Sequence, residues 1–139
     1  MADTTTAFSV RAYAKGVDIA PRKVSIVASL VRNRSVADAL VILEHVPRRS
    51  ALPLKKAIES AKANAINNHG LDGKTLTIQT LSVTTGTRLK RFKPHMRGMT
   101  RPFQKKTSNI LVVLSGAEKP QKPAAKKPAS EKAVTKEEK

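Results

Sequence analysis

The sequence of 139 residues contains no cysteine and no tryptophan, and it has only three phenylalanines and one tyrosine. The absence of cysteine excludes disulfides, thiol nucleophiles and Cys-ligated zinc. Without disulfides, the composition gives no reason to expect a secreted protein. No apolar run reaches the 18 or so residues that a membrane-spanning helix needs. Acidic residues are scarce, with 10 Asp and Glu against 27 Lys and Arg, which gives a net charge of +17 and a pI near 10.8. This excess favours a polyanionic partner, either nucleic acid or an anionic membrane surface, over a small-molecule substrate.

Targeting and catalytic signals are missing as well. Residues Met1 to Ser9 carry an acid and three threonines where a signal peptide has positive charge and then an apolar stretch, so the cytoplasm is the expected compartment. His45, His69 and His95 share no metal-ligand spacing, and the sequence has no G-x-S-x-G, H-E-x-x-H or glycine-rich phosphate motif. We therefore expect no catalytic residue, no metal site and no cofactor.

The positive charge is concentrated in one segment. Residues 86–109 contain eight cations and no acid: Arg88, Lys90, Arg91, Lys93, Arg97, Arg101, Lys105 and Lys106. Residues 117–139 contain seven Lys and four Glu, with Val134 as the only sizeable apolar residue. Such a tail cannot offset its ordering entropy by burial, so we expect it to be disordered. The localised charge indicates one dedicated binding element.

Local signals in the first half predict a strand followed by three helices. Residues 8–14 alternate apolar and polar side chains with the two-residue period of a half-buried strand. Pro21 suits the first position of a helix, and Ser35 can cap the next one. A third helix opens near Ser50 and ends at Gly70, a residue suited to a left-handed terminator.

Apolar side chains at helical spacing predict the buried faces. In the first helix they are Val24, Val27, Val31, Ile26 and Leu30, and the opposite, phosphate-compatible face holds Arg22, Ser25, Ser29 and Arg32. In the second helix the apolar side chains are Val36, Ala39, Leu40 and Leu43. In the third helix they are Leu54, Ile58, Ala61 and Ala65. This pattern leaves no apolar helix face over for dimerisation.

The second half predicts two strands joined by a basic ribbon. Leu76 and Ile78 alternate in one phase and Leu81 and Val83 in the other, so a bulge near residues 79–80 is expected. Residues 109–115 form an apolar run of strand length. The basic segment between the two strands is too long for a structureless loop, and we expect both strands to continue outward as a hairpin. Each arm reaches roughly 30 Å, at about 3.3 Å per residue.

The hairpin is expected to turn near Met96 to Met99, with Gly98 supplying the awkward dihedral angle. Phe92 and Phe103 lie among its cations, together with Leu89 and the two methionines. This mixture suits insertion between nucleic-acid strands, with cations on phosphates and apolar groups on sugars or unstacked bases. The alternative is a disordered basic loop. For Arg22, Lys23 and Arg32 the alternative is a solvated helix surface.

Four motifs resemble the family of large-subunit ribosomal proteins called L-twenty-two in bacterial nomenclature. They are Ala20 to Lys23, Glu59 to Ala65 followed by Asn68, Gly86 with Leu89 to Pro94, and Lys105 to Ile110. Together they span most of residues 10–115. The chain departs from the family pattern at the hairpin tip, where His95 and Met99 replace two arginines.

The resemblance implies an α+β domain of order β-α-α-α-β-β, with three helices on a three-stranded antiparallel sheet. We expect this domain to cover residues 1–116, including an extended hairpin at about 84–110, and to be followed by the tail at 117–139. The resemblance also implies a cytoplasmic, ribosomal protein that binds large-subunit rRNA, helps its assembly and contacts neighbouring ribosomal proteins. The rRNA-binding residues expected on this basis are Arg11, Lys15, Arg22, Lys23 and the eight cations of residues 86–109. Met96, Arg97, Gly98 and Met99 are expected to line the polypeptide exit tunnel and meet the nascent chain.

Two other readings remain open. Basic β-arms also enter DNA minor grooves, so the alternative function is a DNA-bending, chromatin-like protein. Arm-type DNA benders generally act as dimers, which the helix pattern disfavours. An RNA-modifying enzyme is a third reading, and it lacks both a cofactor loop and an acid/base constellation.

Overall fold

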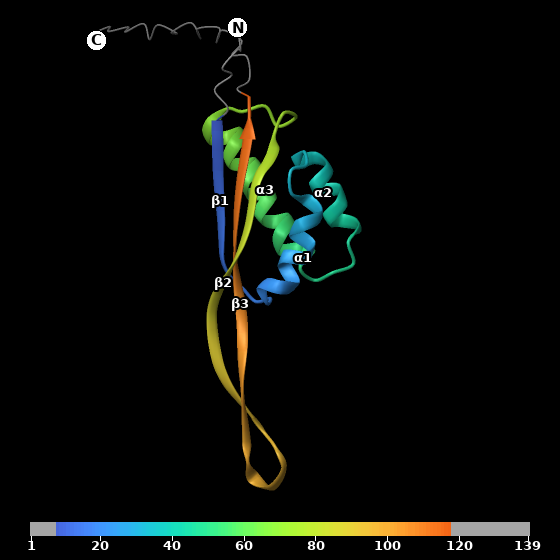
Figure 1. Ribbon diagram of the computed structural model, residues 1–139. Coiled ribbons are helices and arrows are strands. Elements are labelled where there is room, and N and C mark those ends of the chain that lie inside the picture. Colours follow the sequence, from blue (N-terminus) through green and yellow to red (C-terminus); the bar gives the residue numbers. More distant parts are fainter. Residues whose placement is uncertain (1–7, 118–139) are drawn as a thin grey trace, which may run out of the picture.

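The computed structural model describes residues 8–117, which form an α+β domain with a long projecting hairpin (Figure 1). In chain order the elements are β1 (Phe8–Val17), α1 (Pro21–Val31), α2 (Val36–His45), α3 (Ala51–His69), β2 (Thr77–Pro94), the 3-10 turn η1 (Met96–Gly98) and β3 (Thr100–Gly116). The strands pair antiparallel in the order β1-β3-β2. The predicted fold class and element order are confirmed. The tail predicted to be disordered lies, from residue 118 on, outside the described residues.

The helix boundaries follow the local sequence signals. Pro21 begins α1, and Ser35 caps α2 by accepting a hydrogen bond from the Asp38 N–H at 3.1 Å. Gly70 ends α3 with a φ of 61°, a conformation that costs glycine little. All three boundaries confirm the sequence prediction.

The core lies between the helices and one face of the sheet, and the three helices gather on that face (Figure 1). Its largest fully buried side chains include Val24, Val27, Leu54, Ile58, Ile78, Ile110 and Leu114. On the other face of the sheet Arg11 and Tyr13 are exposed. One face of the sheet is therefore left free of helices.

The apolar face of α1 is narrower than predicted. Val24, Val27 and Val31 are buried, but Ile26 and Leu30 are 55% and 47% exposed. A residue two positions further along a helix is rotated by about 200°, so Ile26 points away from the sheet that covers Val24. The assignment of Ile26 and Leu30 to the buried face was wrong. The expectation that no apolar helix surface remains was wrong for the same reason.

A β-bulge in β2 explains the change of phase in its sequence. Ile78 pairs with Leu114 and Thr80 with Val113, which leaves Gln79 as the extra residue. Ile78 and Leu81 therefore both face the core, at 1% and 3% exposure. The predicted bulge is confirmed.

Beyond the body, β2 and β3 continue as a two-stranded hairpin that extends far from the helices (Figure 1). The pairing shifts between Thr85 and Arg88 and then runs regularly from Arg88 opposite Lys106 to Pro94 opposite Thr100. Gly86 lies at this shift, where an added Cβ would sit 2.5 Å from the Thr107 hydroxyl oxygen. Glycine is therefore required there for close approach of the two strands, and the predicted hairpin is confirmed.

The hairpin turns at η1, as predicted, but with two left-handed residues. Gly98 has a φ of 73°, and Arg97 also has a positive φ, at 56°. The Met99 N–H donates to the Met96 carbonyl at 3.2 Å and the His95 N–H to the Met99 carbonyl at 2.7 Å. The expectation that Gly98 supplies the unusual dihedral angle is confirmed, and Arg97 adds a second left-handed residue that was not predicted.

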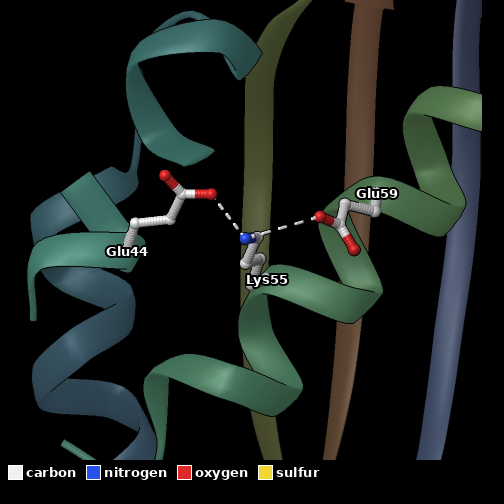
Figure 2. A network of polar contacts seen from close by, with 3 residues as sticks. All are labelled: Glu44, Lys55 and Glu59. Carbon is white, nitrogen blue, oxygen red and sulfur yellow. Dashed lines mark hydrogen bonds and ion pairs between the residues drawn. The ribbon is translucent and has the colours of Figure 1, made fainter. Parts of the chain in front are cut away.

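Helices α2 and α3 are joined by a small ionic network, in which Lys55 lies between two glutamates (Figure 2). Lys55 Nζ is 2.6 Å from Glu44 Oε1 and 3.9 Å from Glu59 Oε1. The hydrogen bond and charge of Lys55 lower the pKa of Glu44, and the hydrogen bond to Glu44 raises the pKa of Lys55. The Glu44–Lys55 pair therefore connects α2 to α3, whereas the longer Lys55–Glu59 pair lies within α3.

Candidate nucleic-acid interface

The cations of the hairpin are distributed over both of its faces. Directly opposed residues of an antiparallel pair point to the same side, and successive residues alternate. The register therefore places Arg88, Lys106, Lys90 and Phe92 on one face, and Lys105, Arg91, Lys93, Arg101 and Phe103 on the other. Each face thus presents several positive charges and one aromatic ring.

The aromatic and apolar side chains of the hairpin are open to solvent. Phe92 is 69% exposed and Phe103 is 38% exposed, and Leu89 is 40% exposed. The Lys93 ammonium lies 5.1 Å from the centroid of the Phe103 ring, a cation–π distance. Each of the three apolar side chains keeps part of its surface exposed, Phe92 most of all, so they are available to stack on bases or to pack on sugars.

At the base of the hairpin, Lys105 is paired with an acid from the body. Its Nζ lies 2.8 Å from Asp18 Oδ2, in the connection between β1 and α1. Lys105 was predicted to bind rRNA, and the structure gives it a carboxylate partner within the chain. The pair ties the base of the hairpin to the start of α1.

The tip presents its side chains to solvent. Met96 and Met99 are 65% and 59% exposed, and Arg97 is exposed between them. The predicted tip residues therefore all lie together at the far end of the hairpin (Figure 1).

The predicted body cations lie in two places. Arg11 and Lys15 lie on β1, where the Lys15 ammonium is 5.6 Å from the centroid of the Tyr13 ring. Arg22 and Lys23 lie in the first turn of α1, and both are exposed.

Arg32 was assigned to the same phosphate-compatible face, but its Nε donates to the Leu81 carbonyl at 3.1 Å. Arg32 therefore links α1 to β2.

Sequence reasoning missed two further cations, Arg48 and Arg49. They lie in the connection from α2 to α3 and, with Lys23, line a hollow of about 460 Å³. Two adjacent arginines just before a helix with no acid in its first turn were the available signal. Their position near Lys23 depends on the packing of α1 against the connection from α2 to α3, which no local pattern reveals.

The histidines of the described residues lie far apart. His45 and His69 are the last residues of α2 and α3, and His95 lies on the distant hairpin. Within residues 8–117 no three His, Asp or Glu side chains are grouped to hold a metal ion. No helix of the described part is long and apolar enough to cross a membrane.

Comparison with known proteins decides the family. The family model described as ribosomal protein L22p/L17e matches residues 12–115. The chain belongs to this ribosomal protein family. It is 44% identical to the large ribosomal subunit protein uL22 of Lacticaseibacillus casei over 118 residues, 85% of this chain and 99% of the relative. It is also 44% identical to the protein of that name from Pediococcus pentosaceus, over 83% of this chain and 96% of the relative.

Family membership confirms the predicted resemblance and sets the class of function. An L22p/L17e protein is a structural constituent of the ribosome and not an enzyme, so the RNA-modifying alternative is discarded. The DNA-bending alternative also loses its support. Its rejection rests on the family alone, because the exposed Ile26 and Leu30 invalidate the argument from a missing dimer face.

Proposed function

We propose that this chain is a structural component of the large ribosomal subunit that binds rRNA with its hairpin and helps that RNA to fold. The proposal is supported by the relatives, which are named as large ribosomal subunit proteins. The binding unit is residues 1–116 as one domain, with the hairpin at about 84–110 as its main contact. Neighbouring ribosomal proteins contact the body.

The observation that carries the proposal is the two-sided hairpin. Its seven paired cations face both ways, with an aromatic ring on each side and no acid in residues 86–109. A ribbon that lies on a single polyanion would need only one basic face. Two basic faces fit a ribbon that passes between RNA segments, neutralising phosphates on each side and bringing the segments together.

We further propose that the tip reaches the polypeptide exit tunnel. There Met96, Arg97, Gly98 and Met99 form part of the tunnel wall and meet the nascent polypeptide. None of the three residues of η1 is buried, so the protein's own fold does not need their side chains. Their exposure supports a role toward a partner.

The tip is tested by replacing Met96 to Met99 with Asn-Gly, a two-residue hairpin turn. The variant is expected to unfold at the same temperature as the unaltered protein, because the tip packs against no core residue. It is also expected to co-sediment with large subunits, and cross-linking from the tip to a stalled nascent chain is expected to disappear. The matched control is a photoreactive residue at Val41, exposed on α2, which should not cross-link to the nascent chain in either protein.

Three outcomes would contradict the proposal. Failure of the unaltered chain to co-sediment with large subunits would contradict the ribosomal role. A large fall in the unfolding temperature of the tip variant would show that these residues belong to the core. Equal cross-linking from the tip and from Val41 would contradict the tunnel placement.

A further inference from the structure

A basic hollow lies where the starts of two helices meet. It has a volume of about 460 Å³, and the residues that line it include Asp18, Ala20, Lys23, Arg48, Arg49 and Ser50. These residues come from the connection between β1 and α1, the first turn of α1, and the connection between α2 and α3. The hollow thus combines segments that lie far apart in the sequence. Even the two nearest lining residues of these segments, Lys23 and Arg48, are 25 positions apart.

The charge of the hollow favours an anion. Three cations line it against one acid, and the carboxylate of that acid, Asp18, is already paired with Lys105 at 2.8 Å. The ion pairs found among residues 8–117 involve none of Lys23, Arg48 and Arg49. Within the part of the chain that the structure describes, these three positive charges at the hollow therefore have no ion-pair partner.

Both helices point their amino-terminal ends at the hollow. Ala20 is the N-cap of α1 and Ser50 that of α3, which are 11 and 19 residues long. Neither helix has a side-chain cap or an acid in its first turn, whereas α2 has both, in Ser35 and Asp38. The positive end of a helix dipole is stabilised by negative charge, and here two such ends lack it.

Ser50 supplies an independent sign of a ligand. It lines the hollow, is only 4% exposed, and makes no capping hydrogen bond to α3. Within the described residues its hydroxyl has no other hydrogen-bond partner. Among residues 8–117 the fully enclosed side-chain polar atom without a hydrogen bond is the Ser108 hydroxyl oxygen, so the Ser50 hydroxyl keeps a small accessible surface. Because Ser50 lines the hollow, an acceptor oxygen placed there can take the hydrogen bond that this hydroxyl offers.

We propose that this hollow binds a phosphate group of the RNA backbone, with the Ser50 hydroxyl donating to a phosphate oxygen and Lys23, Arg48 and Arg49 neutralising its charge. The inference deepens the proposed function and rests on it for the identity of the ligand. The Asp18–Lys105 pair places the hollow beside the base of the hairpin. An RNA strand that follows the hairpin to its base can therefore continue into the hollow.

The anion site is tested with inorganic phosphate and the full chain, using amide chemical shifts from nuclear magnetic resonance. Saturable shifts are expected at Ser50, Leu52 and Lys23. Ser50→Ala is expected to weaken phosphate binding about tenfold, the effect of one hydrogen bond to a charged group. The double variant Arg48→Gln/Arg49→Gln is expected to weaken it further. The matched control, Lys56→Gln/Lys74→Gln, removes the same charge from exposed positions outside the hollow and should bind phosphate normally.

A second arm separates RNA phosphate from free phosphate. The Arg48→Gln/Arg49→Gln variant is titrated with large-subunit rRNA at several salt concentrations, and its slope of log affinity against log salt should fall by about 1.5. Absence of phosphate shifts, or equal weakening by the control variant, would overturn the site. Phosphate binding with an unchanged rRNA slope would overturn RNA as the ligand. Failure of the unaltered chain to bind rRNA would contradict the proposed function, while the phosphate arm would still decide the site.

Discussion

At the scale of single residues, exposure separates side chains that maintain the fold from those that serve a partner. Leu54 on α3 is fully buried, while Phe92 on the hairpin is 69% exposed although it is larger. A large apolar side chain in water contributes nothing to the folded state of the free protein. Its presence on a basic hairpin is consistent with the proposed RNA partner, in which a base or sugar would be its contact.

The contrast can be measured with two alanine substitutions. Leu54→Ala is expected to lower the free energy of unfolding by about 2–5 kcal/mol, because it leaves a cavity in the core. Phe92→Ala is expected to change it by less than about 0.5 kcal/mol and to weaken rRNA binding by about 1–3 kcal/mol. Urea unfolding and filter binding measure the two quantities. A Phe92→Ala protein that is unstable but binds rRNA normally would contradict this division.

At the scale of elements, α2 and α3 are linked by the Lys55 network as well as by their apolar contacts. The pKa of Glu44 is lowered in the folded protein, so its contribution to stability is present at neutral pH and is lost as pH falls through the acidic range. The pKa of Lys55 is raised above its ordinary value of 10.5, so its contribution is lost only as pH rises beyond that value.

Lys55→Met is therefore expected to flatten the acid limb of the stability curve. Between neutral pH and pH 3 the unfolding temperature of the variant should fall less than that of the unaltered protein. The effect is small, because both glutamates are largely exposed to solvent. Lys56→Met, one residue along the helix and outside the network, is the control and should keep the original curve. Identical acid limbs for all three proteins would show that the network does not contribute to stability.

The elements also show how far sequence reasoning extends. Pro21 and Gly70 act through their own backbone conformation, and Ser35 acts through a hydroxyl that accepts a hydrogen bond three residues on. The bulge at Gln79 is predicted by the change of phase in the apolar residues on either side of it. Such local features were predictable. The exposure of Ile26 and Leu30 was not, because helical spacing defines a stripe but not how much of it the sheet covers.

The candidate site also has a part that local sequence predicts and a part that depends on the folded chain. The hairpin cations were found from sequence because they are consecutive and lack acids. The Asp18–Lys105 pair and the Arg32 bond to Leu81 depend on chain segments that meet only in the fold. The same holds for the hollow, where Lys23 meets Arg48 and Arg49. The positive φ of Arg97 was missed because glycine was assumed to take all of the strain of the turn.

At the scale of the whole molecule, the protein has a body that folds around its own core and a hairpin with no core of its own. Residues 86–106 are exposed almost throughout, whereas the body buries one apolar layer between sheet and helices. An isolated two-stranded hairpin is marginal in water, so under the proposed function we expect the hairpin to become more ordered when it binds RNA. Under the proposed function, the hairpin is the main electrostatic contact of this protein to rRNA.

The most direct test is the salt dependence of binding to large-subunit rRNA. One variant replaces Arg88, Lys90, Arg91 and Lys93 by Gln, and a matched control replaces Arg34, Lys56, Lys62 and Lys74, four body cations outside the expected interface. Each phosphate contact contributes about 0.7–0.9 to the slope of log affinity against log salt. We expect the slope to fall by about 3 for the hairpin variant and by less than about 1 for the control. Equal changes in the two variants, or an unchanged slope in the hairpin variant, would contradict this expectation.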